Sequence, residues 1–258
     1  MPFSFLKEKQ FNDLDSVEAT LHHRQIILNK PFLRKLYEEW YRTFVQLTTV
    51  QSEGKLLEIG SGGGFLKDIY PEIITSDIKE LPDCKMVINA ESLPFENGSL
   101  NAIFMLNVLH HIPNCENFFK EAERTLMKDG LIFMIEPANT LFSRFIYNKL
   151  HQEPFDENTG WEFPANGPLS GANVALPWIV FHRDANEFHQ KFPLLKTEKI
   201  TLHTPFRYLL TGGLSYKSVV PGWGYSTVSF FEKLFSPLHP YTAMFQTILV
   251  RKTDERQT

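Results

Sequence analysis

Short apolar runs alternate with amphipathic stretches through the middle of the chain. Buried strands read as short apolar runs, whereas surface helices repeat their apolar positions every three or four residues. On this basis strands are expected at 55–60, 73–77, 85–89, 101–106 and 130–136, and helices at 63–70, 114–127 and 139–151. The alternation predicts a doubly wound α/β sheet, mostly parallel, with helices on both faces.

The two ends of the chain extend this core. Residues 15–50 predict helix, with Pro31 suited to a first helical turn. An apolar stripe follows it at helical spacing: Phe32, Leu36, Trp40, Phe44 and Leu47. Gly54 interrupts this pattern, and 195–203 and 244–252 predict the last two of seven strands. We therefore expect one domain over 1–258, in which 1–53 is a helical cap and 54–151 is the core.

Two stretches, 152–194 and 204–243, exceed what a minimal sheet of this kind needs. Residues 152–183 contain four prolines and three glycines, and residues 204–243 contain nine aromatic side chains but four charged ones. Loops of this length are usually functional or disordered, and so many aromatic residues disfavour disorder. Both are interpreted as covers over a substrate site. The alternative is an aromatic extension of the core or a dimer contact, and the oligomeric state stays open.

Composition excludes several classes of function. The net charge is −4 and no run of Lys and Arg outweighs it, so nucleic acid is not an expected partner. Cys84 and Cys115 are too few for a disulfide framework. The first residues lack the apolar segment of a signal peptide, and no run approaches the ~20 apolar residues of a membrane span. A cytoplasmic location is expected, without stable membrane insertion, although a lipid-like substrate is compatible with this composition.

The segment Lys55-Leu-Leu-Glu-Ile-Gly-Ser-Gly-Gly-Gly-Phe65 is the most informative part of the chain. A predicted strand ends at an acid, Glu58, and enters a turn with glycine at 60, 62 and 64. Such a turn brings the backbone close to a ligand, because glycine lacks Cβ and tolerates positive φ. The dinucleotide-binding pattern G-x-G-x-x-G fails, because Phe65 occupies its third glycine position.

This turn resembles the first motif of the class I S-adenosylmethionine-dependent methyltransferases. Four later segments resemble the same family in the same order: Ile73-Ile-Thr-Ser-Asp77, Asn89-Ala-Glu-Ser-Leu-Pro-Phe95, Asn101-Ala-Ile-Phe-Met-Leu-Asn-Val-Leu-His-His-Ile112 and Arg124-Thr-Leu-Met-Lys-Asp-Gly130. Asn89 replaces a common Asp, and Asp129 replaces a common Pro. The resemblance implies S-adenosylmethionine as cofactor and an antiparallel hairpin formed by the last two strands.

The resemblance also assigns roles to individual residues. Asp77 would accept hydrogen bonds from the ribose, the 89–95 segment would wrap the adenine, and Glu58 would brace the turn or receive the α-ammonium group. The full implied cofactor set is Glu58, Gly60, Ser61, Gly62, Gly64, Phe65, Asp77, Ile78, Asn89, Ala90, Glu91, Asn107 and Val108. Glu58 could instead only cap backbone N–H groups, and Asp77 could be a solvated loop charge or a helix cap.

Candidate catalytic residues lie at the ends of the fourth and fifth strands. His110 or His111 could be a general base, line the cofactor pocket or cap the helix after Pro113. Glu136 could orient an acceptor hydroxyl or amine, or cap the helix that starts near Asn139. Candidate substrate contacts from 204–243 are Arg207, Tyr208, Trp223 and Tyr225. The histidine and cysteine spacings fit no metal motif, so no metal is expected.

The sequence thus predicts methyl transfer from S-adenosylmethionine to an O, N or C atom of a small, apolar or mixed-polarity acceptor. The acceptor itself is not identified. One alternative is a protein that binds the cofactor without catalysis. A second is an NAD-linked oxidoreductase, which Phe65 and the lack of a Tyr-x-x-x-Lys pair after the core disfavour.

Overall fold

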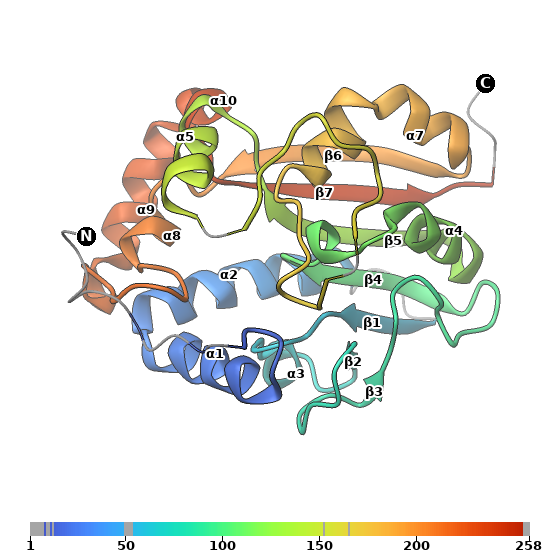
Figure 1. Ribbon diagram of the computed structural model, residues 1–258, viewed down its shortest axis with the longest axis horizontal. Helices are drawn as coiled ribbons and strands as arrows, with labels where there is room; N and C mark the ends of the chain where they lie inside the picture. Colours follow the sequence, from blue (N-terminus) through green and yellow to red (C-terminus); the bar gives the residue numbers. More distant parts are fainter. Residues whose placement is uncertain are drawn as a thin grey trace.

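In the described part of the chain, seven strands form one mixed sheet (Figure 1). The computed structural model describes residues 8, 11, 13–48, 54–151, 153–164 and 166–254. The strands are β1 (Lys55–Ile59), β2 (Ile74–Asp77), β3 (Met86–Val87), β4 (Leu100–Leu106), β5 (Leu126–Pro137), β6 (Leu195–His203) and β7 (Phe245–Lys252). Their order across the sheet is β3-β2-β1-β4-β5-β7-β6.

The strand directions confirm the predicted fold class. β1 pairs in parallel with β2 and β4, and β4 pairs in parallel with β5. β7 lies antiparallel between β5 and β6, so the last two strands form the expected hairpin at one edge. From β1, the chain adds β2 and β3 on one side and then crosses to add β4 and β5 on the other side, so the strand order switches between β1 and β4. In an open sheet, this switch point beyond the carboxyl ends of the strands is where ligands bind.

Helices cover both faces of the sheet, because alternate residues of the central strands point to opposite sides. On one face, Ile103 and Met105 of β4 pack in a core with Phe118 and Phe119 of α4 (Cys115–Thr125). On the other face, Phe104 packs in a second core with the stripe of α2 (Pro31–Thr48). The further helices that surround these cores are α1 (Val17–Asn29), α5 (Leu141–Leu150), α6 (Leu176–Trp178) and α7 (Ala185–Lys191).

Several predicted boundaries differ from the structure. The stretch 15–50 is two helices, α1 and α2, separated at Lys30, and its last two residues lie outside the described residues. The predicted helix 63–70 shrinks to α3 (Leu66–Ile69). The backbone N–H of Phe65 donates to the Tyr41 hydroxyl at 3.3 Å. The residue that precedes α3 is thus hydrogen-bonded to α2.

The 204–243 segment is helical and tied to the N-terminal helices. It contains α8 (Arg207–Leu210), α9 (Tyr225–Leu234) and α10 (His239–Thr242), which group beside α5 in Figure 1. The buried Lys30 ammonium donates to the carbonyl oxygens of Gly213, at 2.9 Å, and of Tyr216. Gly212 has φ of +71°, and a Cβ there would lie 2.2 Å from the Tyr216 carbonyl oxygen. These contacts describe a fixed tight turn rather than a hinge.

Among the described helices, none is both long and apolar enough to cross a membrane.

Candidate functional site

The turn between β1 and α3 has a conformation that requires glycine. Gly60 has φ of +65° and Gly62 has φ of +47°, values that side chains with a Cβ rarely adopt. A Cβ on Gly60 would lie 2.6 Å from Val108, and a Cβ on Gly64 would lie 2.5 Å from the Tyr41 hydroxyl. The backbone therefore bends tightly at the carboxyl end of β1 and leaves open space on its outer side.

Two buried carboxylates hold this turn. Asp77, at the end of β2, accepts the backbone N–H of Gly62 at 3.0 Å through Oδ2. Glu58, on β1, accepts the Ser61 hydroxyl at 2.7 Å. Burial, reinforced by the negative charge of Asp77, raises the pKa of Glu58 to about 7 despite that hydrogen bond. Glu58 and Asp77 together form a site of negative charge, and a cationic group bound there would reduce the repulsion between the two carboxylates.

Asn107 presents an unsatisfied polar atom at the same sheet edge. It directly follows β4 and has φ of +55°, a strained value for a residue other than glycine. Its backbone N–H donates to the carbonyl oxygen of Ile135, but its side-chain Oδ1 is buried without a hydrogen-bond partner. Buried acceptors are almost always paired. A strained residue with an orphaned acceptor is the pattern expected where a ligand supplies the missing donor.

These groups open into a cavity of about 530 Å³ at the switch point. Most of its wall is apolar, which suits a small-molecule site with a few polar groups. The predicted residues that line it are Glu58, Gly60, Ser61, Gly62, Gly64, Asp77, Ile78, Asn89, Ala90, Asn107, Val108, His110, His111 and Tyr208. The structure thus collects side chains from β1, β2, β4, the 3₁₀ turn Leu109–His111 and α8 around one space.

His110 is fixed by Glu136. The Nδ1–H of its ring donates to Glu136 Oε2 at 2.6 Å, and Glu136 Oε1 accepts the backbone N–H groups of Val108 and Leu109, both at 2.8 Å. Glu136 is completely buried and does not line the cavity. It therefore positions the histidine turn, and the helix cap we had considered for it is formed by Thr140 and Ser143 instead.

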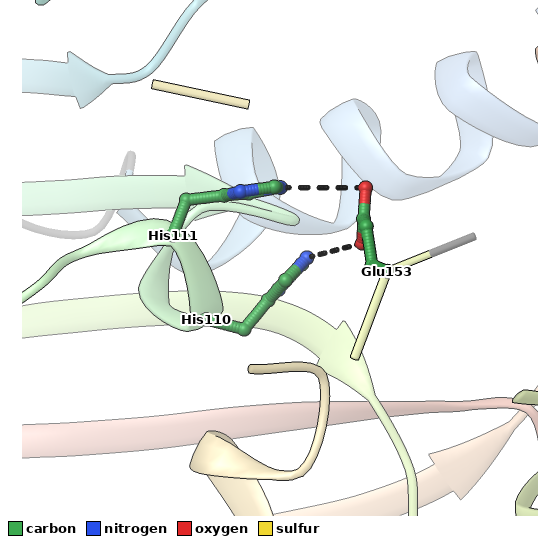
Figure 2. Close-up of side chains that lie close together, drawn as sticks. All are labelled: His110, His111 and Glu153. Atoms are coloured by element: carbon green, nitrogen blue, oxygen red, sulfur yellow. Dashed lines mark ion pairs between the residues drawn. The ribbon is translucent and has the colours of Figure 1, made fainter. Parts of the chain in front are cut away.

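His110 and His111 face a third side chain, Glu153 (Figure 2). His110 Nε2 lies 3.5 Å from one Glu153 oxygen, and His111 Nε2 lies 3.9 Å from the other. Burial lowers the pKa of His110, but Glu136 and Glu153 outweigh it and raise that pKa to about 9. Burial and the neighbouring His110 lower the pKa of His111 to about 4. At neutral pH His111 is the ring with a free lone pair.

The helix cap considered for the histidines is also absent. Asn114 caps α4 by accepting the backbone N–H of Asn117 at 3.0 Å. The Nδ1–H of His111 instead donates to the Gly171 carbonyl oxygen at 3.2 Å. Both rings are thus held at Nδ1, and their Nε2 atoms face Glu153 beside the cavity.

Several predicted ligand contacts do not line the cavity. Phe65 packs between Tyr37 and Tyr41, and Glu91 accepts the backbone N–H of Asn114 at 3.2 Å. Trp223 is 82% exposed on the outer surface. For Phe65 and Glu91 the motif located a segment that lines the cavity, through 60–64 and 88–90, but not the direction of the side chain.

Arg207 and Tyr225 belong to a buried ionic cluster rather than to the cavity wall. The Arg207 guanidinium, 5% exposed, pairs with Glu232 and also donates to Glu39 at 2.8 Å and to the Tyr225 hydroxyl at 2.6 Å. The cluster joins α8 and α9 to α2. Part of the 204–243 segment is therefore core, as our alternative interpretation held, while Tyr208 and the 214–216 turn reach the cavity.

Sequence reasoning missed the residues that complete the cavity wall. His23 and Ile27 come from α1, Tyr147 from α5, and Glu153 from the loop after α5. No motif marks them, and Glu153 lies 42 positions beyond His111 in the chain. Both predicted cover regions contribute to the cavity wall, 152–194 through Glu153 and the 167–169 loop, and 204–243 through Tyr208 and the 214–216 turn.

Comparison with known proteins agrees with this geometry. Residues 57–134 match a family model described as a methyltransferase domain. This segment of the chain is similar to a methyltransferase domain. This match spans the glycine turn, Asp77, the 89–95 segment and the histidine turn, so the resemblance predicted from five motifs is confirmed. No curated protein sequence matches the chain significantly.

One solved structure shows the same fold at low sequence identity, and a second is similar over most of the chain. A SAM-dependent methyltransferase from Archaeoglobus fulgidus is 14% identical with a TM-score of 0.52, covering 85% of this chain and 94% of its own. Geranyl diphosphate C-methyltransferase from Streptomyces coelicolor A3(2) is 14% identical with a TM-score of 0.45, covering 97% of this chain and 90% of its own.

Proposed function

We propose that this protein transfers a methyl group from S-adenosylmethionine to an O, N or C atom of a small, apolar or mixed-polarity acceptor. One observation carries the proposal. A single cavity of about 530 Å³ has the glycine turn and Asp77 on one wall and His110, His111 and Glu153 on another. The wall proposed to bind the cofactor and the wall proposed to accept a proton thus line the same cavity.

The residues of the first wall fit the proposed cofactor. S-adenosylmethionine, when bound, supplies an electrophilic methyl group on a sulfonium. Asp77 retains Oδ1 and Oδ2 at the cavity edge for hydroxyl donors, Glu58 suits a cationic amine, and the orphaned Asn107 Oδ1 suits an N–H or O–H donor. Gly60 and Gly62 have no side chains, so a ligand can approach the backbone of the turn closely.

The second wall would orient the acceptor and exclude water. Tyr147, Tyr208 and Ile27 give it apolar surface, which disfavours a highly charged acceptor. The neutral His111 ring would accept a proton from an O–H or N–H acceptor through Nε2, because its Nδ1–H is held by Gly171. Positioning and desolvation would supply most of the acceleration, since the cofactor provides the reactive group.

Two measurements test this proposal. Calorimetry should detect S-adenosylhomocysteine binding and no comparable binding of NAD. Incubation of the protein with S-adenosylmethionine and a cell-extract metabolite pool should form S-adenosylhomocysteine and a product 14 mass units heavier than its acceptor. Absence of S-adenosylhomocysteine binding would refute the proposal, whereas binding without any turnover across polar and lipid extracts would favour the non-catalytic alternative.

A further inference from the structure

Three side chains at the acceptor wall have the composition of a metal site. His110, His111 and Glu153 each offer one ligand atom, and these atoms lie within 4.8 Å of one another. Figure 2 shows both rings directed at the Glu153 carboxylate. Their separations of 3.5 and 3.9 Å are those of long ion pairs rather than of short, well-formed hydrogen bonds.

The remaining nitrogen of each ring is already held by an acceptor. His110 Nδ1–H donates to Glu136, and His111 Nδ1–H donates to the carbonyl oxygen of Gly171. Histidines that bind metals usually donate their other N–H to a carboxylate or a backbone carbonyl, which fixes the tautomer and aims the lone pair. Both rings meet that condition. His111 has its lone pair at Nε2, whereas His110 Nε2 is protonated at neutral pH and would release that proton to an ion.

We infer that His110 Nε2, His111 Nε2 and a Glu153 carboxylate oxygen bind a divalent transition-metal ion such as Zn²⁺. Ligands at about 2.0–2.1 Å from a tetrahedral ion are about 3.3 Å apart. The 3.5 Å between His110 Nε2 and Glu153 Oε2 fits this spacing. His111 Nε2 lies 3.9 Å from the other oxygen, Oε1, and the three ligand atoms lie within 4.8 Å of one another, so His111 and the carboxylate would shift to close around the ion. A divalent charge would also offset the two carboxylates, Glu136 and Glu153, that enclose His110.

The inferred ion would have an open position towards the acceptor. All three ligands line the cavity, and three protein ligands with one open position is the arrangement of catalytic zinc sites. An acceptor oxygen or nitrogen could fill that position and be held in front of the transferred methyl group. With the ion bound, His111 Nε2 is a ligand, so the ion rather than the His111 lone pair would activate the acceptor. This role rests on the proposed methyl transfer, but binding of the ion does not.

Metal content provides the test. The full chain is stripped with a chelator, dialysed, and titrated with Zn²⁺ and with Co²⁺, which reports histidine ligation through its visible absorption. We expect about one ion per chain for the parent protein, and at least a tenfold weaker affinity in His111→Gln and in Glu153→Gln. His189→Gln is the matched control, because His189 lies on α7 outside the cavity.

Each outcome decides the inference separately from the proposed function. A parent protein that binds S-adenosylhomocysteine but neither Zn²⁺ nor Co²⁺ would overturn the metal site and leave the proposed function intact. Equal metal affinity in the parent, His111→Gln and Glu153→Gln, with folding confirmed by circular dichroism, would place the ion elsewhere and also overturn it. Loss of metal in both variants but not in His189→Gln would support it even if no S-adenosylhomocysteine bound.

Discussion

The two walls of the cavity are built in different ways. The wall formed by the glycine turn, Asp77 and Asn107 comes from three adjacent parallel strands and uses backbone conformation and short acidic side chains. The opposite wall combines α1, α5, α8 and the loop that carries Glu153, and it uses histidines, tyrosines and apolar side chains. Under the proposed function, the first wall would hold the cofactor and the second would hold the acceptor. Function on a common fold is set by such added segments.

The largest expected effect separates the roles of the two walls. In His111→Gln we expect kcat to fall by about 10²–10⁴, because the ring that retains a lone pair at neutral pH is lost. The affinity for S-adenosylhomocysteine should change by less than about threefold. Steady-state kinetics with the acceptor found by product screening, together with calorimetry, measures both. A loss confined to cofactor affinity would show that His111 is only part of the pocket wall.

A second variant tests how the acceptor wall is held. Glu232 is buried and accepts the backbone N–H groups of Phe206 and Arg207 as well as the Arg207 side chain. Glu232→Ala would leave the Arg207 charge without this partner, so the free energy of unfolding should fall by about 3 kcal/mol. Denaturant titration measures the loss. The exposed-site control is Glu187→Ala, which should cost less than about 0.5 kcal/mol.

The same experiment distinguishes core from cover in the 204–243 segment. If Glu232→Ala has the stability of the parent, α8 and α9 do not depend on this cluster and the segment can act as a loose cover. A large loss in the free energy of unfolding, with unchanged S-adenosylhomocysteine affinity in the remaining folded protein, would show that the 204–243 segment stabilises the acceptor wall.

The contrast also explains what the sequence could predict. The strands and the glycine turn were predictable because their signals are local: apolar runs, a Gly60–Gly64 spacing, and an acid at the end of β2. The cluster of His110 with Glu136 and Glu153 depends on contacts across 26 and 43 positions, which periodicity does not reveal. Arg207 was misplaced for the same reason, since its partner Glu39 lies 168 positions away on α2.

A smaller effect is expected on the cofactor wall. Asp77→Ala removes the acceptor of the Gly62 N–H and the proposed acceptor of the ribose hydroxyls. The affinity for S-adenosylhomocysteine should weaken by about 1–3 kcal/mol, the scale of charge-assisted hydrogen bonds. Glu80→Ala is a matched control, because it removes an exposed acid three residues away. Equal affinity in Asp77→Ala and the parent would contradict the assignment of this wall to the cofactor.

The smallest expected effect is a proton released from Glu58. Burial raises its pKa to about 7 in the free protein, so at pH 6 the carboxyl is mostly protonated. An ammonium group bound beside it would lower that pKa, and binding would therefore expel the proton. Because the bound state favours the ionised carboxylate, affinity for S-adenosylhomocysteine should rise by about fivefold from pH 6 to pH 7 and then level off. Calorimetry in two buffers of different ionisation enthalpy counts the protons directly. Glu58→Gln keeps an acceptor for Ser61 but cannot ionise, so the release should vanish. If the variant releases as many protons as the parent, the cationic end of the cofactor does not lie at Glu58.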